Sequence, residues 1–412
     1  MGSEWSHTTV GSFCPFSYGK GLPEKKRNPN GSFKVYGSNG PVGTHDQPLV
    51  YEPGIVIGRK GTVGAVHFAS EPFWPIDTTF YVVSTSDRHL KYTYYLLKSV
   101  GLENMNADSA VPGLNRDAAH ARQIFVPSHE EQHAIAHILG SLDDKIEVNR
   151  QMNQTVEATA RAIFKSWFVD FDPVRANVEG RPTGLPDDIA ALFPESFEDS
   201  ELGEIPKGWK SRSLYDSAKY INGAAYRNFH FTDEEGALPV IKIAELKNGV
   251  SGQTKFTKTE LDDKYRISDG EILLSWSGNP DTSIGTFVWC GGPAWLNQHI
   301  FRVLPHQEIE KHFVFYLLKY LRPVFAEIAR DKQTTGLGHF TARDMKQLMV
   351  VHPPENILAT FNDSVGPMFD RWYGNLFESN TLASLRDTLL PKLISGELRV
   401  PDAEKFIEEA GV

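Results

Sequence analysis

The sequence has little cysteine and no long apolar run. Cys14 and Cys290 are the only cysteines among 412 residues, too few for a disulfide framework or a four-cysteine zinc site, so we expect a reducing, cytoplasmic setting. No apolar stretch reaches the ~18 residues of a membrane-spanning helix, and the N-terminal MGSEWSHTT does not have the pattern of a signal peptide. We therefore expect no membrane partner.

Compact catalytic motifs are also scarce. The sequence contains neither the G-x-x-x-x-G-K-[ST] phosphate loop of ATP-driven motors nor the G-x-S-x-G turn of serine hydrolases. One stretch, His129-Glu-Glu-Gln-His133, fits the H-E-x-x-H pattern of zinc peptidases. Ser128, however, is suited to cap a helix that begins at His129, which would leave this histidine at an exposed helix end. We expect no catalytic residue, metal or cofactor in this chain, and we keep a zinc metallopeptidase as an alternative.

A long helix is predicted over residues 127–168. Ser128 and Glu131 match the S-x-x-E capping box at its start. Behind the cap, mostly apolar residues recur at steps that alternate between four and three: Ile135, Leu139, Leu142, Ile146, Asn149, Asn153, Val156, Ala160, Ile163 and Trp167. A mean step of about 3.5 residues is typical of a helix that packs along a narrow seam against another helix.

The same spacing returns later in the chain. At a constant offset of 226 the seam residues are Phe361, Val365, Met368, Trp372, Asn375, Ser379, Leu382, Arg386, Leu389 and Leu393. Both seams have polar residues in the middle, such as Asn149 and Asn375, and polar seam residues fix register and partner choice. Arg386, which aligns with Ala160, is the one poor match. The sequence therefore predicts two long antiparallel helices that pair as a coiled coil.

The stretches that precede the two helices repeat as well. Short apolar runs separated by Gly and Pro indicate strands in both. Trp74 aligns with Trp295 and Phe80 with Phe301 at one offset. Short segments also match, namely 5–10 with 209–214, 54–58 with 270–274, and 113–114 with 336–337. A repeat of this length indicates duplication, and two similar units suggest pseudo-two-fold symmetry.

The sequence thus predicts an α+β protein with six segments. They are a mixed α/β domain (1–127), a long helix (128–169), an exposed linker rich in Pro and acidic residues (170–208), a second mixed α/β domain (209–352), a second long helix (353–400) and a tail (401–412). The net charge of −10 divides unevenly among them, with +2 in residues 1–127, −10 in 128–204, +3 in 205–352 and −5 in 353–412. Both mixed domains are mildly basic, which favours a nucleic-acid partner more than the total charge suggests.

Several stretches resemble one family. The run DDKIEVNRQMNQTVEATARAIFKSWFVDFDPVRA is similar to the central region of the DNA specificity subunits of type I restriction-modification systems, and LRDTLLPKLISGELRV resembles their second such region. KVYGSNGPVG, IVIGRKGTVG and PFWPIDTTFYV resemble the first target-recognition domain, whereas ALPVIKIAELKNG and GEILLSWSG resemble the second. The resemblance covers essentially the whole chain, but it does not identify the DNA sequence that is recognised.

The resemblance implies a non-catalytic protein that reads a split, asymmetric site on double-stranded DNA, one half with each target-recognition domain. It implies that the paired helices set the unread spacer and bind two modification subunits, which methylate adenine at N6 with S-adenosylmethionine. Restriction subunits with ATP-driven translocase activity would complete the assembly. A coiled-coil scaffold that binds no DNA is a second alternative, which a steep fall of DNA affinity with salt would exclude.

Candidate DNA contacts lie in basic and Gly-rich loops. Lys and Arg suit phosphates and guanine, Asn suits adenine, and Gly-rich turns let the backbone approach a groove closely. In the first domain the candidates are Lys20, Lys25, Lys26, Arg27, Tyr36, Ser38, Asn39, Arg59 and Lys60. In the second domain they are Tyr226, Arg227, Asn228, Lys242, Trp276, Ser277, Asn279, Gln333, Thr334 and Thr335. A plain solvated loop or hairpin turn explains residues 20–27 and 36–39 equally well, whereas the position of Arg59 and Lys60 at the end of an apolar strand favours a DNA role.

Overall fold

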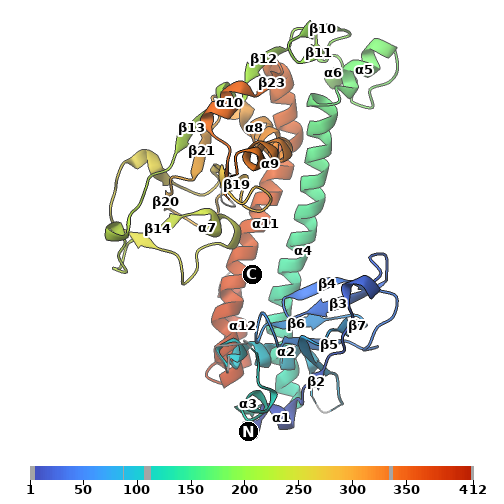
Figure 1. The fold of residues 1–412 in the computed structure, drawn as a ribbon, viewed down its shortest axis with the longest axis vertical. Helices are drawn as coiled ribbons and strands as arrows, with labels where there is room; N and C mark the ends of the chain where they lie inside the picture. The colour runs from blue at the N-terminus through green and yellow to red at the C-terminus, as the bar shows by residue number, and fades with distance from the viewer. Residues whose placement is uncertain (1–4, 87, 106–112, 334–336, 410–412) are drawn as a thin grey trace. The chain divides into compact units, whose positions relative to one another are not determined.

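The computed structural model describes residues 5–86, 88–105, 113–333 and 337–409 (Figure 1). Two compact units make up the chain. Unit 1 holds residues 1–148 and 378–412, and unit 2 holds residues 149–377. The candidates Thr334 and Thr335 lie outside the described residues. In the described part, no helix combines the length and apolarity that are needed to cross a bilayer.

Unit 1 is built on small sheets. A four-stranded sheet has the order β2-β8-β5-β6, a three-stranded sheet has the order β4-β3-β7, and β1 pairs with β9. The strands are β1 Ser6–Thr9, β2 Ser17–Tyr18, β3 Phe33–Gly37, β4 Gly40–His45, β5 Gly54–Gly58, β6 Val66–Ala69, β7 Phe73–Pro75, β8 Thr79–Val83 and β9 Gln123–Val126. The shorter helices are α1 Val10–Phe13, α2 Leu90–Ser99, α3 Arg116–His120 and α12 Val400–Glu409, with the 3-10 turns η1 Glu24–Lys26 and η2 Leu102–Asn104.

Helix α2 covers the four-stranded sheet of unit 1 (Figure 1). Its N-cap is His89, whose imidazole accepts a hydrogen bond from Tyr92 N. Tyr92 and Leu96, which lie one turn apart on one helix face, are buried in the same cluster as Ile55 and Phe80 of the sheet. Aromatic and apolar residues at helical spacing therefore give α2 one packing face against the sheet.

Unit 2 repeats this strand order. Its four-stranded sheet has the order β13-β21-β17-β19, a second sheet has the order β15-β14-β20-β16, and β12 pairs with β23. The strands are β10 Phe197–Ser200, β11 Gly203–Pro206, β12 Lys210–Ser213, β13 Lys219–Asn222, β14 Leu238–Ile241, β15 Phe256–Thr257, β16 Arg266–Ile267, β17 Ile272–Ser275, β18 Ser277–Gly278, β19 Gly285–Val288, β20 Ala294–Leu296, β21 Ile300–Leu304, β22 Gly338–His339 and β23 Met349–His352. The shorter helices are α5 Asp172–Glu179, α6 Asp187–Ala190, α7 Ile243–Asn248, α8 Lys311–Tyr320, α9 Arg322–Asp331 and α10 Ala342–Gln347, with the 3-10 turns η3 Leu214–Ser217, η4 Asn228–His230, η5 Asp263–Tyr265 and η6 Glu308–Glu310.

The strand registers confirm the duplication. The parallel pair β3 and β7 places Val35 opposite Trp74, and the parallel pair β14 and β20 places Val240 opposite Trp295. Parallel pairs require a crossover connection, so their recurrence at the same point of both units reflects one shared topology.

Two of the predicted segment matches are wrong by a few residues. Phe80 faces Ile57, whereas Phe301 faces Leu274, so residues 54–58 correspond to 271–275 rather than to 270–274. Residues 113–114 correspond to 339–340 rather than to 336–337, because Leu114 N donates to the carbonyl of Arg59 as Phe340 N donates to that of Trp276. Gly residues led the sequence comparison to the wrong alignment at both places.

The two long helices are α4 His129–Phe168 and α11 Glu355–Ser395. Every predicted seam residue is buried or half-buried. In unit 1, Leu142 at the start of α4 shares a core with Leu389 near the end of α11. In unit 2, Asn375 Nδ2 of α11 donates to Asn153 Oδ1 of α4 at 2.8 Å. The pairing is therefore antiparallel within each unit, as predicted, and the polar seam residues bond to each other.

The segment 170–208 is a folded part of unit 2, not the exposed linker that the sequence predicted. It contains α5, α6 and the hairpin of β10 and β11. Phe171, Val174 and Phe193 are buried in the core of unit 2 together with Trp209. The Pro and acidic content of the segment obscured these apolar residues. Arg175 Nε also donates to the carbonyl of Asp170, tying the start of α5 to the end of the long helix.

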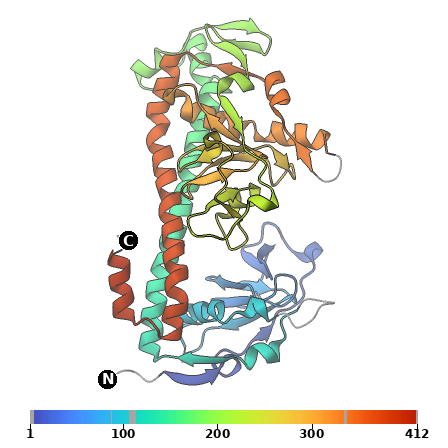
Figure 2. The same ribbon diagram turned by 90° about the vertical axis from the view of Figure 1, so that its left-hand side faces the viewer.

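The C-terminal tail is likewise folded. Helix α12 lies beside the start of α4 (Figure 2), and its Ala403 is buried in the core of unit 1. Arg399 Nη1 forms an ion pair with Glu131 Oε1 at 3.0 Å. Ser128 Oγ caps α4 by accepting from Glu131 N at 3.3 Å. Glu131 therefore takes part in the N-terminal cap of α4 through its backbone and anchors the C-terminal tail through its side chain.

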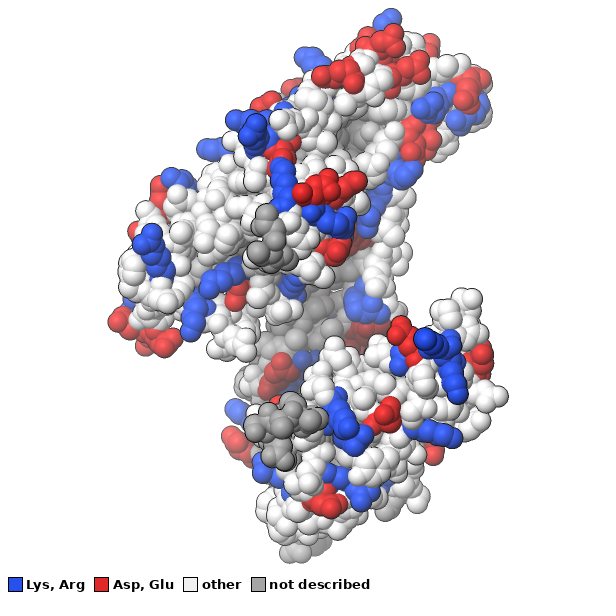
Figure 3. Space-filling model, viewed as in Figure 1, with Lys and Arg blue, Asp and Glu red and all other residues white. Residues whose placement is uncertain are grey.

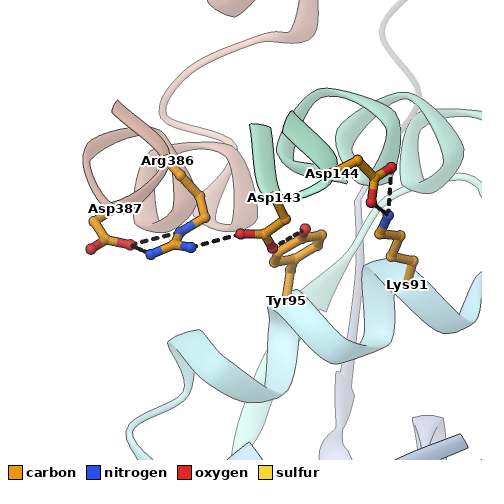
Figure 4. Close-up of polar contacts among 6 residues, drawn as sticks. All are labelled: Lys91, Tyr95, Asp143, Asp144, Arg386 and Asp387. Carbon is orange, nitrogen blue, oxygen red and sulfur yellow. Dashed lines mark hydrogen bonds and ion pairs between the residues drawn. The ribbon is translucent and has the colours of Figure 1, made fainter. Parts of the chain in front are cut away.

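The poorly matched seam residue Arg386 lies in an ionic network of unit 1 (Figure 4). Its Nη1 donates to Asp143 Oδ1 at 2.6 Å and its Nη2 to Asp387 Oδ1 at 2.7 Å. Tyr95 OH donates to the other oxygen of Asp143 at 2.6 Å. Burial and the Asp143 carboxylate raise the pKa of Tyr95. Asp143 thus ties α2 and α11 to α4, and it neutralises a cation that the apolar seam would otherwise exclude.

We predict that Asp143→Ala lowers the free energy of unfolding by about 2 kcal/mol, because a half-buried guanidinium and a phenol lose a charged partner. Urea unfolding of the full chain measures the loss. Asp144→Ala is the matched control, since Asp144 pairs with Lys91 at an exposed position and should cost less than about 1 kcal/mol. Adding Arg386→Leu to Asp143→Ala should restore part of the loss. Equal losses for the two aspartates would contradict this account.

A buried histidine makes the stability of unit 2 depend on pH. His352, at the end of β23, forms a contact of 3.3 Å with Glu310 Oε1. Burial, with a contribution from the Arg212 cation, lowers the pKa of His352 to about 4. An unfolded histidine binds its proton near pH 6.5. The unfolded chain therefore binds more protons than the folded one between pH 6.5 and 4, and this histidine destabilises the fold progressively as the pH falls through that range.

We predict that His352→Gln flattens this dependence. Between pH 7 and 5 the original chain should lose about 1–2 kcal/mol more of its unfolding free energy than the variant does. Urea unfolding at a series of pH values gives the two slopes, and the remaining titrating groups, which both chains share, cancel in the comparison. Parallel slopes would show that His352 is protonated in the folded state at a pH close to its unfolded value.

Candidate nucleic-acid interface

The end of strand β5 gathers three of the predicted contacts of unit 1. The carbonyl of Thr78 accepts hydrogen bonds from Ser38 Oγ at 2.7 Å, from Arg59 N at 2.9 Å and from Lys60 N at 3.1 Å. Ser38 is buried, so its hydroxyl serves this junction rather than an external ligand. Arg59 is half-buried and Lys60 is exposed. The structure therefore brings these residues together but gives Ser38 a structural role.

An exposed tyrosine completes this site. Tyr18 is 53% exposed, and the guanidinium groups of Arg59 and Arg116 lie 5.6 and 5.0 Å from its ring centroid. Arg59 Nε and Nη2 donate to the carbonyl of Asp77 at 3.1 and 2.6 Å, which orients the guanidinium. We call Tyr18, Arg59, Lys60 and Arg116 the strand-end site of unit 1. Two cations beside one exposed ring present both donors and a stacking face to a ligand.

The basic loop of unit 1, residues 20–27, contains both exposed and anchored side chains. Lys20, Lys25 and Lys26 are exposed. Arg27 instead holds the loop to the body of the unit, because its Nε and Nη1 donate to the carbonyls of Leu22 and Val42. The three lysines are therefore available to phosphates, whereas Arg27 mainly shapes the loop.

The hairpin between β3 and β4 contains one surface candidate and one core residue. Asn39 is exposed at its tip. Tyr36 is only 6% exposed, packs edge-on against Phe73 with 5.7 Å between ring centroids, and has a pKa raised by burial. The prediction that Tyr36 contacts DNA is corrected accordingly, because its ring belongs to the core.

Unit 2 has a corresponding site at the end of β17. Trp276 Nε1 donates to Asn222 Oδ1 at 2.9 Å, and the Trp276 ring contacts the imidazoles of His299 and His339 with centroid distances of 5.5 and 5.8 Å. Ser277 is buried, and its Oγ lies 3.0 Å from His339 Nδ1, which leaves it a structural role. We call Asn222, Trp276, His299 and His339 the strand-end site of unit 2.

The remaining candidates of unit 2 are dispersed. Arg227 and Asn228 are exposed in the η4 turn beside Phe229, which is 76% exposed. Lys242 is exposed and its Nζ lies 5.3 Å from the ring centroid of Phe231. Asn279 is exposed but also stabilises its own turn, and Gln333 is exposed at the end of α9. Tyr226 is 7% exposed and packs with Trp295, so it is a core residue and not a surface contact.

Sequence reasoning missed five members of these sites. Tyr18, Arg116, Asn222, His299 and His339 come from segments that lie far in sequence from the strand end that they join. The available signals were weak: Tyr18 precedes the Gly19–Gly21 turn, and Arg116 follows Asn115, the N-cap of α3. Only the pairing of β2 with β8 and of β13 with β21 brings Tyr18 and Asn222 to these positions.

Charge alone does not mark either site. Figure 3 shows Lys and Arg side chains scattered among Asp and Glu on the face that it draws. The two sites nevertheless differ electrostatically. Arg59, Lys60 and Arg116 make the first cationic, whereas burial, with a contribution from His339, lowers the pKa of His299 in the second. His299 is therefore neutral at neutral pH, and the second site offers hydrogen bonds and ring faces with little charge.

The H-E-x-x-H stretch has structural roles. Glu131 pairs with Arg399, and the Gln132 side chain accepts from His89 N at 3.1 Å and donates to the carbonyl of Pro127 at 3.1 Å. Among the described residues, no group of three or more His, Cys, Asp and Glu is arranged to hold a metal. The zinc metallopeptidase alternative therefore gains no support.

Comparison with known proteins identifies one family. A family model described as "Type I restriction modification DNA specificity domain" matches residues 2–158 and 206–357. The MjaIX type I restriction enzyme specificity subunit of Methanocaldococcus jannaschii is 29% identical over 363 residues, which cover 84% of this chain and 78% of the relative. The HindI specificity subunit of Haemophilus influenzae is 27% identical over 333 residues, covering 70% and 71%.

A solved structure shares the fold. The type I restriction-modification S subunit from M. genitalium superposes with a TM-score of 0.60 at 17% identity and covers 95% of this chain and 96% of that chain. The two segments that match the family model contain the two strand-end sites and together span well over half of the chain. The chain therefore belongs to the family of type I restriction-modification DNA specificity proteins.

Proposed function

We propose that the chain recognises a split, asymmetric site on double-stranded DNA, with each unit reading one half. The observation that carries the proposal is that units of one topology place unlike side chains at the same strand end, cationic in unit 1 and largely neutral in unit 2. Base edges differ in their pattern of donors and acceptors, so unlike side chains at one position select unlike bases. The exposed Lys20, Lys25 and Lys26 of unit 1 supply phosphate contacts, which add affinity without adding sequence preference.

In this proposal the chain supplies recognition and leaves catalysis to its partners. Two modification subunits that methylate adenine at N6, and restriction subunits with translocase activity, assemble on it. Helices α4 and α11 each run through the boundary between the units, between residues 148 and 149 and between residues 377 and 378. We propose that these helices carry the docking surfaces for modification subunits and set the length of the unread DNA between the half-sites.

We predict that deleting the gene from its host removes N6-methyladenine from one split, asymmetric motif. Single-molecule sequencing of the genomic DNA, with the gene intact and deleted, measures the change. Restoring the gene on a plasmid should restore methylation at the same motif and nowhere else. If no motif changes while a methyltransferase co-purifies with the chain, DNA recognition by this chain is refuted. A DNA-free scaffold would behave in that way.

We also predict that one extra heptad in both long helices lengthens the unread spacer. Seven residues placed after Val148 in α4 and seven after Phe377 in α11 preserve the seam spacing and add about 10 Å of helix, which corresponds to a spacer longer by up to about three base pairs at ~3.4 Å each. Methylome sequencing of cells that carry the variant reads the new motif. Both half-sites should stay as they were. An altered half-site would contradict a spacing role for the helices.

A further inference from the structure

The two strand-end sites occupy equivalent points of the duplicated fold. In unit 1, Phe80 pairs with both Tyr18 and Ile57, and Arg59 follows two residues after Ile57. In unit 2, the corresponding pairs of Phe301 are Asn222 and Leu274, and Trp276 follows two residues after Leu274. Tyr18 therefore corresponds to Asn222, and Arg59 corresponds to Trp276.

Main-chain hydrogen bonds around these residues repeat in the same pattern. Arg59 N donates to the carbonyl of Thr78, and Trp276 N donates to that of His299. The carbonyl of Arg59 accepts from Leu114 N at 2.8 Å, and that of Trp276 accepts from Phe340 N at 2.8 Å. The backbone of both residues is thus held between two strands and a following loop. Their side chains can differ without disturbing this framework.

The side chains around the equivalent positions differ in chemistry. Beside Arg59, Lys60 corresponds to Ser277, and Arg116, which follows the N-cap of α3, corresponds to Ala342, which follows the N-cap of α10. Unit 1 therefore presents a cluster of N–H donors that carry positive charge. Unit 2 replaces it with an indole, an amide and imidazoles.

Unit 2 contains two buried polar atoms at its site, Gln298 Oε1 and His299 Nδ1, that lack a hydrogen-bond partner among the described residues. In unit 1, Arg116 Nε forms an ion pair with Asp117 Oδ1 at 3.6 Å. Most buried polar groups in proteins are hydrogen-bonded, so such atoms mark positions where an external partner is absent. His299 contacts the Trp276 ring, and its Nε2 lies 3.3 Å from the Gln298 amide nitrogen. His299 Nδ1 therefore belongs to the strand-end site of unit 2, and Gln298 adjoins that site.

We propose that Arg59 and Trp276 are the specificity-determining residues of the two halves of the DNA site, an inference that rests on the proposed function. Arg59 is oriented by the Asp77 carbonyl through two of its five N–H groups. Its remaining donors suit the N7 and O6 acceptors of guanine, the base that arginine reads most often. Trp276 contributes a ring face, and the neighbouring His299 and Gln298 provide neutral hydrogen-bonding groups for a base edge without a guanidinium.

The exposed lysines of the η1 turn have a different role in DNA binding. Lys25 corresponds to Phe229 in the η4 turn, at the offset that relates Tyr18 to Asn222. Both are solvent-exposed. An exposed cation positions the duplex through its phosphates, and its removal should weaken binding to all sequences alike. Lys25→Ala is therefore the contrast for Arg59→Ala.

The test uses the full chain in its host, in the assembled enzyme. Arg59→Ala should relax the first half-site only, with discrimination in favour of guanine falling by about 5- to 150-fold, and Trp276→Ala should alter the second half-site only. Methylome sequencing gives the motifs, and binding of the purified complex to duplexes with single base-pair changes gives the ratios. Lys25→Ala should weaken binding to all DNA sequences alike and reduce the salt dependence of the affinity. Arg122→Ala, at an exposed arginine of unit 1 outside the site, should match the original chain.

Conservative variants separate recognition from folding. Arg59→Lys keeps the charge but loses the planar fork, and it should still relax the first half-site; Trp276→Phe should still shift the second. The inference would be overturned if the level of methylation fell at both half-sites while the recognised motif stayed the same, in the alanine and the conservative variants alike. If gene deletion removes a motif but every variant leaves both half-sites unchanged, the inference fails and the proposed function stands. If deletion removes no motif, the proposed function itself fails.

Discussion

The antiparallel seam of α4 and α11 is the constraint on which both units depend. Each helix contributes to two cores. Ile135 and Leu139 of α4 are buried in unit 1 with Leu393 of α11, and at the other ends Trp167 of α4 is buried in unit 2 with Phe361 of α11. Burying apolar side chains is the main favourable contribution to folding, so neither unit completes its core without both helices. The 3.5-residue spacing of the two helices thus determines which segments complete the core of each unit.

Polar groups in this seam make the pairing specific. Asn153 accepts from Asn375 and donates to the carbonyl of Trp372 in unit 2, while in unit 1 the guanidinium of Arg386 bonds to Asp143. A shift of one heptad would leave the buried amides and the half-buried guanidinium without these partners, which costs stability. An apolar seam alone would permit such a shift. The two polar contacts therefore select one register at the expense of some stability.

The sequence predicted the helices well and the surfaces less well, for physical reasons. A 3.5-residue period sustained over nine steps can arise in few other ways, and Ser128 marked where the helix begins. Strands are short, and a shift of one residue exchanges their faces, which explains the misplaced match of residues 54–58. Tyr36 and Tyr226 are core residues although each lies within three residues of a Gly, and the sequence pattern did not separate them from surface residues. The strand-end sites were only partly found because Tyr18 and His339 reach them through sheet pairing, which one sequence does not reveal.

Duplication of a scaffold explains how one chain can recognise an asymmetric site. At Arg59 and Trp276 the backbone is fixed by equivalent hydrogen bonds, and Phe80 and Phe301 support both positions from the neighbouring strand. Both side chains are only partly buried, and Trp276 packs against the core of unit 2. The same backbone position therefore accepts arginine in one unit and tryptophan in the other, and the exchange changes the ligand chemistry. A buried position such as Tyr36 has no such freedom, because close packing penalises any change of volume. Divergence after duplication is therefore directed to the strand ends, where it alters recognition at the lowest cost in stability.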